Sequence, residues 1–367
     1  MKYFKPVFKG IKKPLKFLKV FLKQKAGRLD VPKILPYRGY GNETDVFIQG
    51  RVIEGKGLAK PKDNQQIRQN ILATLKRFAS DEIPGVNVKA GFLNEKQIVT
   101  TDEMGFFYFH FHLPGKEKEL LTKEWHTVHF SLPDEIVENQ PQVYTTGEVR
   151  VISGKQSRII VSDIDDTVMI SHSTQTLRKL RLMLFKNAFT RLPFPGVARF
   201  YRSLEAGKEK QENNPFFYVS SSEWNLYDLL EDFFSLNKLP KGVFLLRKLN
   251  YSIYKFWKPG DGNHEHKYVK IKSLLEFYPE QKFILIGDSG QKDPAIYSKI
   301  AFEFPGRIEA IYIRRIRSKS YAEKQENLDK NLLKVKTFYL EVKDIIQAAR
   351  HAAKNGFASI DLPPEIK

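Results

Sequence analysis

Residues 158–167 read Arg-Ile-Ile-Val-Ser-Asp-Ile-Asp-Asp-Thr and stand where the sequence pattern of the chain changes. The first four residues are a short apolar run, which is typical of a buried strand. Asp163 and Asp165 follow it directly, with one residue between them. Ligands of open α/β sheets bind at the carboxyl ends of the strands, so both carboxylates are expected at such an edge. There one could act as a nucleophile and the other could transfer protons, whereas an acidic turn without chemistry is the simpler alternative.

Further short apolar runs follow, and amphipathic stretches with helical spacing separate them. The runs are Phe216–Val219, Gly242–Leu246, Lys282–Ile286 and Ile308–Ile313. Apolar strands that alternate with helices predict an α/β fold with a parallel sheet covered on both faces. A C-terminal helical extension is expected over residues 320–355, because Gly356 suits the end of a helix.

Polar residues stand where the later elements of this sheet end or begin. The run Phe216–Val219 leads into Ser220, Ser221 and Ser222, and a hydroxyl at a strand end can hold a phosphoryl oxygen. Ser220 is the first candidate and Ser221 the second, while a helix N-cap is the alternative role. Lys267 begins a predicted helix over 267–277, where an ammonium group near the helix N-terminus can neutralise a phosphate. Taken alone, Lys267 would be an ordinary member of the 61 lysine and arginine residues of the chain.

The run Lys282–Ile286 leads into Gly287-Asp288-Ser289-Gly290-Gln291-Lys292-Asp293. Gly287 is expected to let the backbone turn, and Asp288 is expected at the same edge as the first two aspartates. Hard oxygen ligands suit Mg²⁺. The predicted metal ligands are therefore Asp163, Asp165, Asp288 and Asp293. A plain loop turn, with Asp293 as a helix N-cap, is the alternative, but the complete order of Asp-x-Asp, Ser, Lys and Gly-Asp is hard to obtain by chance.

These elements resemble the four motifs of HAD phosphohydrolases. More narrowly, three stretches resemble the phosphatidate phosphatase family first known from yeast actin patches. They are residues 161–167, 217–227 and 285–297, and the run Pro193–Val197 fits as well. The resemblance covers roughly residues 157–316. It implies a HAD-like Rossmannoid sheet and a Mg²⁺-dependent phosphoric monoester hydrolase that acts on phosphatidate or a related lipid phosphate.

The resemblance also implies roles for single residues. Asp163 would attack phosphorus to form an aspartyl-phosphate, and Asp165 would protonate the leaving alkoxide and later deprotonate water. Asp163, Asp288 and the main-chain oxygen of Asp165 would hold Mg²⁺, with Asp293 supporting the metal shell. The serine and lysine side chains would bind the non-bridging oxygens. The chain between Thr167 and the Pro-Phe-Pro-Gly run has room only for a small cap, so an open site is expected.

The first half of the chain has a different pattern. Strand-like alternation recurs over Asp45–Val52, Val86–Ala90, Gly105–His112 and Thr127–Phe130. Short alternating strands between turns predict an antiparallel, sandwich-like β-rich domain over residues 29–156, followed by the phosphatase domain over 157–367. One helical insert is expected at about Gln65–Ser80.

Residues 1–28 are a distinct basic segment with ten basic residues and no acidic residue. Apolar residues recur in it at helical spacing, namely Phe4, Phe8, Ile11, Leu15, Leu18 and Leu22. Pro14 suits the first turn of a helix. A basic amphipathic segment predicts docking on an anionic membrane surface. A disordered basic tail, or a helix packed on the protein's own body, is the alternative.

The composition of the whole chain restricts the possible partners and functions further. The net charge of +19 favours an anionic partner. The absence of cysteine excludes disulfides and thiolate chemistry. The sequence contains neither 18 consecutive apolar residues nor a clear signal peptide, which favours a cytoplasmic protein that binds membranes peripherally.

Three functions compete on these grounds. The first is a lipid phosphate phosphatase, the second is a phosphatase for nucleic-acid ends or another soluble phosphate, and the third is a binding module with a silent catalytic domain. The intact set of Asp163, Asp165 and Asp288 argues against the third. The amphipathic N-terminus favours the first, so nucleic acid is not expected as a partner. The sequence leaves the oligomeric state open.

Overall fold

The computed structural model of the 367-residue chain describes residues 14–55, 81–153, 158–164, 196–247, 265–290, 292–315 and 331–359. The chain divides into two compact units, Met1–Ile152 and Ser153–Lys367. The predicted insert Gln65–Ser80 and the cap between Thr167 and Pro193 lie outside the described residues. Among the described residues, no helix is long and apolar enough to span a bilayer.

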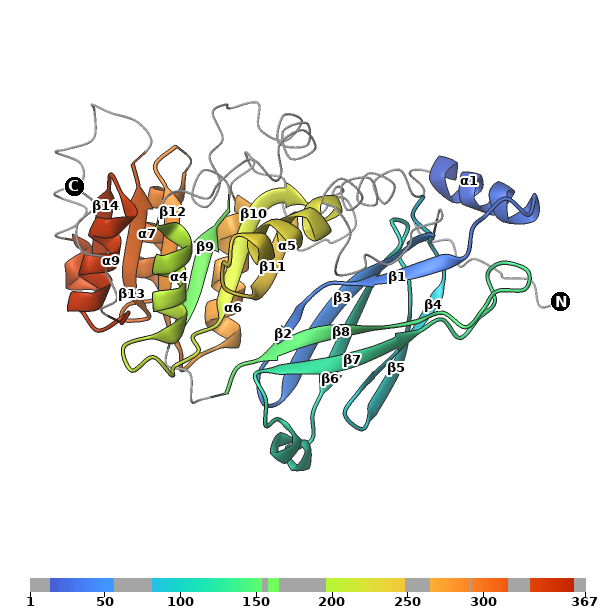
Figure 1. The fold of residues 1–367 in the computed structure, drawn as a ribbon, viewed down its shortest axis with the longest axis horizontal. Coiled ribbons are helices and arrows are strands. Elements are labelled where there is room, and N and C mark those ends of the chain that lie inside the picture. Colours follow the sequence, from blue (N-terminus) through green and yellow to red (C-terminus); the bar gives the residue numbers. More distant parts are fainter. Residues whose placement is uncertain are drawn as a thin grey trace. The chain divides into compact units, whose positions relative to one another are not determined.

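The second unit contains a wholly parallel six-stranded sheet in the order β11-β10-β9-β12-β13-β14 (Figure 1). Its strands are β9 (Arg158–Asp163), β10 (Phe216–Glu223), β11 (Gly242–Arg247), β12 (Lys282–Asp288), β13 (Ile308–Arg314) and β14 (Phe338–Val342). All five predicted apolar runs are strands of this sheet. The α/β class with a parallel sheet is therefore confirmed.

The sixth strand corrects the prediction of a helical extension over 320–355. Residues 338–342 form β14, which pairs in parallel with β13 from Ala310↔Phe338 to Arg314↔Val342. The short run Phe-Tyr-Leu-Glu-Val gains a full ladder of backbone hydrogen bonds at this edge, and this outweighs its position between helical stretches. In the described part of 320–355, residues 331–334 and α9 (Ile345–Lys354) are helical. Asp344 caps α9 by accepting a hydrogen bond from the Gln347 amide.

Helices cover both faces of the sheet, as expected for apolar parallel strands. They are α4 (Val197–Ala206), α5 (Tyr227–Leu236, after the 3₁₀ turn Trp224–Leu226), α6 (Glu265–Phe277), α7 (Asp293–Glu303) and α9. On one face of β10, Phe216 stacks on Tyr201 of α4 and Tyr218 meets Phe234 of α5. On the other face, Phe217 contacts Tyr278 at the end of α6.

The first unit is β-rich, as predicted, but its strands pair into one mixed eight-stranded sheet. They are β1 (Pro32–Pro36), β2 (Gly39–Gly41), β3 (Asp45–Glu54), β4 (Asn87–Phe92), β5 (Glu95–Thr100), β6 (Phe106–His112), β7 (Trp125–Ser131) and β8 (Tyr144–Val151). The expectation of purely antiparallel pairing is wrong at one place. There the short strand β2 pairs in parallel with β8 while it pairs antiparallel with β3.

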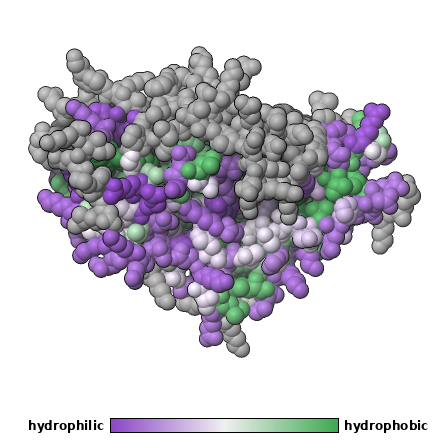
Figure 2. All heavy atoms as spheres, viewed as in Figure 1, coloured by the Kyte–Doolittle hydropathy of each residue, from purple (hydrophilic) through white to green (hydrophobic). Residues whose placement is uncertain are grey.

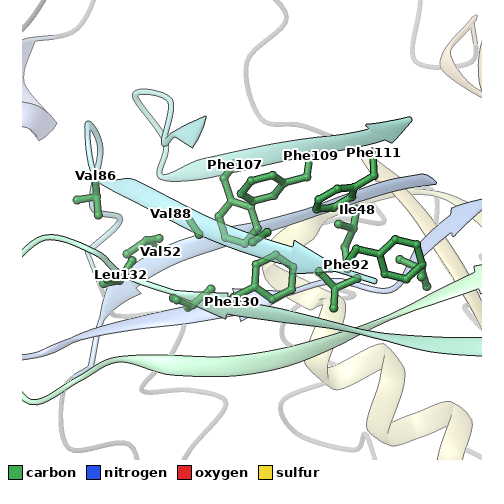
Figure 3. Packing of buried hydrophobic residues seen from close by; sticks show 14 of the residues in the cluster. Ile48, Val52, Val86, Val88, Phe92, Phe107, Phe109, Phe111, Phe130 and Leu132 are labelled. Atoms are coloured by element: carbon green, nitrogen blue, oxygen red, sulfur yellow. The ribbon is translucent and has the colours of Figure 1, made fainter. Parts of the chain in front are cut away.

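The hydrophobic core of this unit lies between facing parts of the sheet. Phe107, Phe109 and Phe111 of β6 point toward Phe130 of β7 and Phe92 of β4 (Figure 3). The ring centroids of Phe107 and Phe130 are 5.5 Å apart. The residues of β6 that alternate with these phenylalanines, such as His110 and His112, face outward. The arrangement is therefore sandwich-like, although the strands pair continuously in one sheet.

The N-terminal helix α1 (Pro14–Lys25) packs on the β-rich unit. Val20 joins the hydrophobic core, and the Lys23 ammonium contacts Glu54 at 2.8 Å and Asp81 at 2.7 Å. Leu22, a member of the predicted apolar face, is 54% exposed, whereas Val20, which is not a member, is buried. The C-terminal part of the helix thus packs on the β-rich unit through Val20 and Lys23 and leaves Leu22 at the surface. The earlier members of the predicted face lie where side chains are not described.

Candidate active site

The site lies at the carboxyl edge of the parallel sheet in the second unit. Asp163 ends the central strand β9, and β10 and β12 flank it on either side. Val219 of β10 pairs with Asp163, and Ile286 of β12 pairs with Ser162. The register therefore carries Ser220 and Asp288 to the same edge as Asp163, as the sequence predicted from the strand ends.

Three carboxylates converge at this edge. Asp163, Asp288 and Asp293 each offer an oxygen, and these three oxygens lie within 4.8 Å of one another. All three residues are fully buried. The main-chain amide of Gly290 donates a hydrogen bond of 2.6 Å to Asp288 Oδ1, which fixes the orientation of that carboxylate. The structure thus brings together three of the four predicted metal ligands.

Lys267 of α6 lies against this cluster. Its Nζ is 2.8 Å from Asp163 Oδ1 and donates a hydrogen bond of 2.7 Å to Asp293 Oδ1. Burial alone would lower the pKa of Lys267, but the two carboxylates raise it above its ordinary value, so the ammonium keeps its charge. The predicted phosphate ligand therefore also positions the predicted nucleophile. Counted as formal charges, three carboxylates and one ammonium leave a net charge of −2.

Gly287 has a different role from the predicted one. It lies inside β12, and a Cβ atom there would come within 2.7 Å of Asp293 Oδ2 and 2.8 Å of Tyr297 Cε2. The missing side chain is what lets α7 bring Asp293 against the strand. Asp293 is the first residue of α7, and its Oδ2 lies 3.4 Å from the donating amide of Asp288. It therefore links Lys267 to the end of β12, and Lys292 takes the N-cap position.

The three serines belong to β10, which runs on to Glu223. Ser220 is fully buried, and its Oγ accepts a hydrogen bond of 2.9 Å from the Ser222 amide. Ser221 is half-buried. Ser220 therefore stabilises the backbone where the strand passes the site, and neither it nor Ser221 caps the following helix.

Two buried hydroxyls beneath Asp163 escaped the sequence analysis. Ser162 Oγ donates to the Asp163 carbonyl at 2.8 Å and lies 2.7 Å from the Tyr201 hydroxyl of α4. Both residues are fully buried. Ser162 could have been noticed in the sequence, because it is a polar residue inside an otherwise apolar strand. Nothing in the sequence pairs Tyr201 with it, because only the packing of α4 brings the two together.

Two further residues of the catalytic segment need separate mention. Asp165, the predicted acid and base, lies outside the described residues, so its role stays a prediction. His266, adjacent to Lys267 in α6, is also buried.

The residues present fit a magnesium ion. The donor set consists of carboxylate oxygens, which are the ligands that hard divalent cations prefer. Two positive charges would balance the formal charge of −2 that remains after Lys267. Mg²⁺ takes one or two carboxylates together with water and phosphate oxygens, so not all three carboxylates need to bind it directly.

Comparisons with known proteins agree with this site. Residues 158–315 match the sequence profile described as phosphatidate phosphatase APP1, catalytic domain. Phosphatidate phosphatase APP1 of Saccharomyces cerevisiae is 32% identical over 155 residues, which are 42% of this chain and 25% of that protein. An uncharacterized protein of Schizosaccharomyces pombe is 26% identical over 287 residues, which are 74% of this chain and 44% of that protein. The chain thus spans less than half the length of both relatives.

The similarity to solved structures is weak. A carbohydrate acetylesterase from Xanthomonas citri aligns over 83% of this chain and 67% of its own, with 10% identity and a TM-score of 0.28. A score this low carries no argument about fold or function. The sequence profile and the yeast protein agree with the resemblance drawn from the motifs: residues 158–315 are similar to the catalytic domain of phosphatidate phosphatase APP1.

Proposed function

We propose that this protein is a Mg²⁺-dependent phosphomonoester hydrolase of the HAD type that acts on phosphatidate or a related lipid phosphate. One observation carries the proposal. A buried cluster of Asp163, Asp288 and Asp293 with Lys267 lies at the carboxyl edge of a parallel sheet, within the segment that matches the APP1 catalytic domain. A structural ion-pair cluster would not require this position at the edge where α/β sheets bind ligands.

The residues would act in two displacements. Asp163 would attack phosphorus and form an acyl phosphate, while the released alkoxide takes a proton from Asp165. Water would then give a proton to Asp165 and displace Asp163 from phosphorus, which releases inorganic phosphate. Lys267, held 2.8 Å from Asp163, would hold a non-bridging oxygen beside the nucleophile. Mg²⁺ bound by Asp163 and Asp288 would offset the charge of the phosphoryl group.

A lipid substrate is supported by features outside the site. The net charge of +19 favours approach to anionic surfaces. On α1, Phe21 is 40% exposed and Leu22 is 54% exposed, and the Lys25 ammonium lies 4.8 Å from the Phe21 ring centroid. Figure 2 shows hydrophobic surface among polar residues on the side of the view where α1 lies. Exposed apolar side chains next to basic ones suit the boundary between headgroups and acyl chains.

Phosphate release across substrate classes tests the proposal. Phosphatidate in mixed micelles, phosphorylated oligonucleotide ends, nucleotides and sugar phosphates would each be offered to the full chain with Mg²⁺ or with a chelator. The expected result is the highest kcat/KM for phosphatidate and a loss of turnover with the chelator. Preference for oligonucleotide ends would support the soluble-substrate alternative, and turnover indifferent to the chelator would remove the metal from the proposal.

A further inference from the structure

A second group of metal-binding side chains lies on the outer face of the β-rich unit. His110 and His112 alternate along β6, and Asp45 begins the neighbouring strand β3. The antiparallel register places Asp45 directly opposite His112 and Phe47 opposite His110. Since side chains two residues apart share a face, Asp45, His110 and His112 all project outward, away from the phenylalanine core.

The two imidazole rings meet the same carboxylate oxygen. His110 Nε2 lies 2.7 Å from Asp45 Oδ1, and His112 Nδ1 lies 3.2 Å from it. Both histidine side chains are well exposed, at 52% and 75%, so an ion can reach them from solvent. The three ligand atoms are spread more widely than those of the buried aspartates. Binding one ion therefore requires the exposed His112 ring to rotate toward His110.

The rest of the site is already ordered. The Thr44 hydroxyl donates to Asp45 Oδ2 at 2.6 Å, which leaves Oδ1 facing the histidines. Partial burial raises the pKa of Asp45, but hydrogen bonds from Thr44 and both histidines lower it to about 2, so the carboxylate is charged at neutral pH. The His110 ring stacks on Phe47 with centroids 4.3 Å apart, and the Gln97 side chain donates to the His110 carbonyl. Such outer contacts orient the ligands of metal sites.

We propose that Asp45, His110 and His112 form a binding site for a divalent transition-metal ion, with Zn²⁺ as the best match. Two imidazoles and one carboxylate are a common set of three protein ligands for Zn²⁺, with water completing the coordination. Imidazole ligands select such ions over Mg²⁺, which distinguishes this site from the all-carboxylate cluster of the other unit. A bound ion would link β6 to β3, its only hydrogen-bonded neighbour among the described strands.

The test is calorimetric titration of the full chain with Zn²⁺ in excess Mg²⁺, together with the visible spectrum of the Co²⁺ complex. Wild type is expected to bind one equivalent through nitrogen ligands and to gain thermal stability. His110→Ala and His112→Ala should each weaken binding by about tenfold or more. His129→Ala, which removes an exposed histidine from β7, and Asp163→Asn should leave this affinity unchanged. Equal Zn²⁺ affinity in wild type and in both histidine variants would overturn the proposal, as would the absence of Zn²⁺ binding by wild type.

Discussion

At the scale of single residues, the site depends on how closely its parts approach one another. Lys267 contacts both Asp163 and Asp293, and Asp293 reaches β12 only because position 287 carries no side chain. A change of one atom at Gly287 therefore acts on the whole cluster. The same arrangement explains why Asp163 and Asp293 can be buried, since each carboxylate lies next to the Lys267 ammonium, while Asp288 accepts a hydrogen bond from the Gly290 amide.

Gly287→Ala is expected to reduce kcat strongly, because the added Cβ would meet Asp293 Oδ2 and Tyr297 at under 3 Å. Such overpacking costs about 1–3 kcal/mol of stability. Phosphate release and thermal unfolding would be measured side by side. Gly115→Ala is the matched control, because a Cβ atom there meets no atom within 4 Å. Its phosphate release and its thermal stability should equal those of wild type. Full activity in folded Gly287→Ala protein would show that the position of Asp293 does not matter for turnover.

At the scale of secondary-structure elements, five of the six parallel strands were predictable and the edge strand β14 was not. Apolar runs such as Lys282–Ile286 leave few alternatives to a buried strand. The short strand β14 was assigned to a helix because its five residues lie between helical stretches, and only the edge of β13 makes them a strand. The position of Asp163 and Asp288 followed from the strand ends. The hydrogen bond from Ser162 to the Asp163 carbonyl and the contact with Tyr201 depend on packing, which the sequence does not display.

Helix α1 offers a test of membrane docking that leaves the fold intact. Deleting residues 1–28 would also remove Val20 from the core and Lys23 from Glu54, so truncation would mix docking with stability. Replacing the exposed Phe21 and Leu22 with serine avoids this. The double variant should bind phosphatidate-containing vesicles about tenfold more weakly in sedimentation, because two apolar side chains no longer enter the boundary region.

The control for this experiment is Ile98→Ser, which changes an equally apolar side chain on β5 that is 60% exposed. It should bind vesicles as wild type does. If the double variant and wild type sediment equally with anionic vesicles, α1 is not the docking element, and the lipid substrate would rest on the similarity of the catalytic domain alone.

Lys270 couples helix α6 to the sheet in a pH-dependent way. Its ammonium donates to the Leu245 carbonyl of β11 at 2.7 Å. Burial, together with the nearby charges of Lys267 and Arg247, lowers its pKa to about 7 from 10.5. Between these values the unfolded chain binds the proton and the folded chain does not, so stability rises with pH across this window. Below pH 7 both states bind the proton, and the destabilisation is fully present.

Relative to wild type, Lys270→Met should therefore raise the free energy of unfolding more at pH 7 than at pH 10. The difference between the two pH values should correspond to about tenfold or more in the folding equilibrium, since each pKa unit is tenfold. Denaturant unfolding of both proteins at both pH values measures it. A constant difference between variant and wild type would mean that Lys270 does not titrate in this range.

At the scale of the whole molecule, the chain joins an α/β unit with the candidate site to a β-rich unit with its own core. The site draws residues from β9, α6, β12 and α7, so it exists only when the α/β unit is folded. The β-rich unit contains α1 with its exposed apolar residues, and the proposed Zn²⁺ ligands of β3 and β6. The proposed chemistry and the proposed surface attachment thus belong to different units of one chain.

The central claim is that Asp163 carries the phosphoryl group during turnover. The most direct test is rapid acid quenching of the full chain during turnover of phosphatidate labelled at phosphorus, in the presence of Mg²⁺. An acyl phosphate survives acid and is released by hydroxylamine, so mass spectrometry can locate it. The account predicts one labelled peptide, modified at Asp163, and neither label nor phosphate release with folded Asp163→Asn protein. Undiminished phosphate release by Asp163→Asn, or label on another residue, would contradict it.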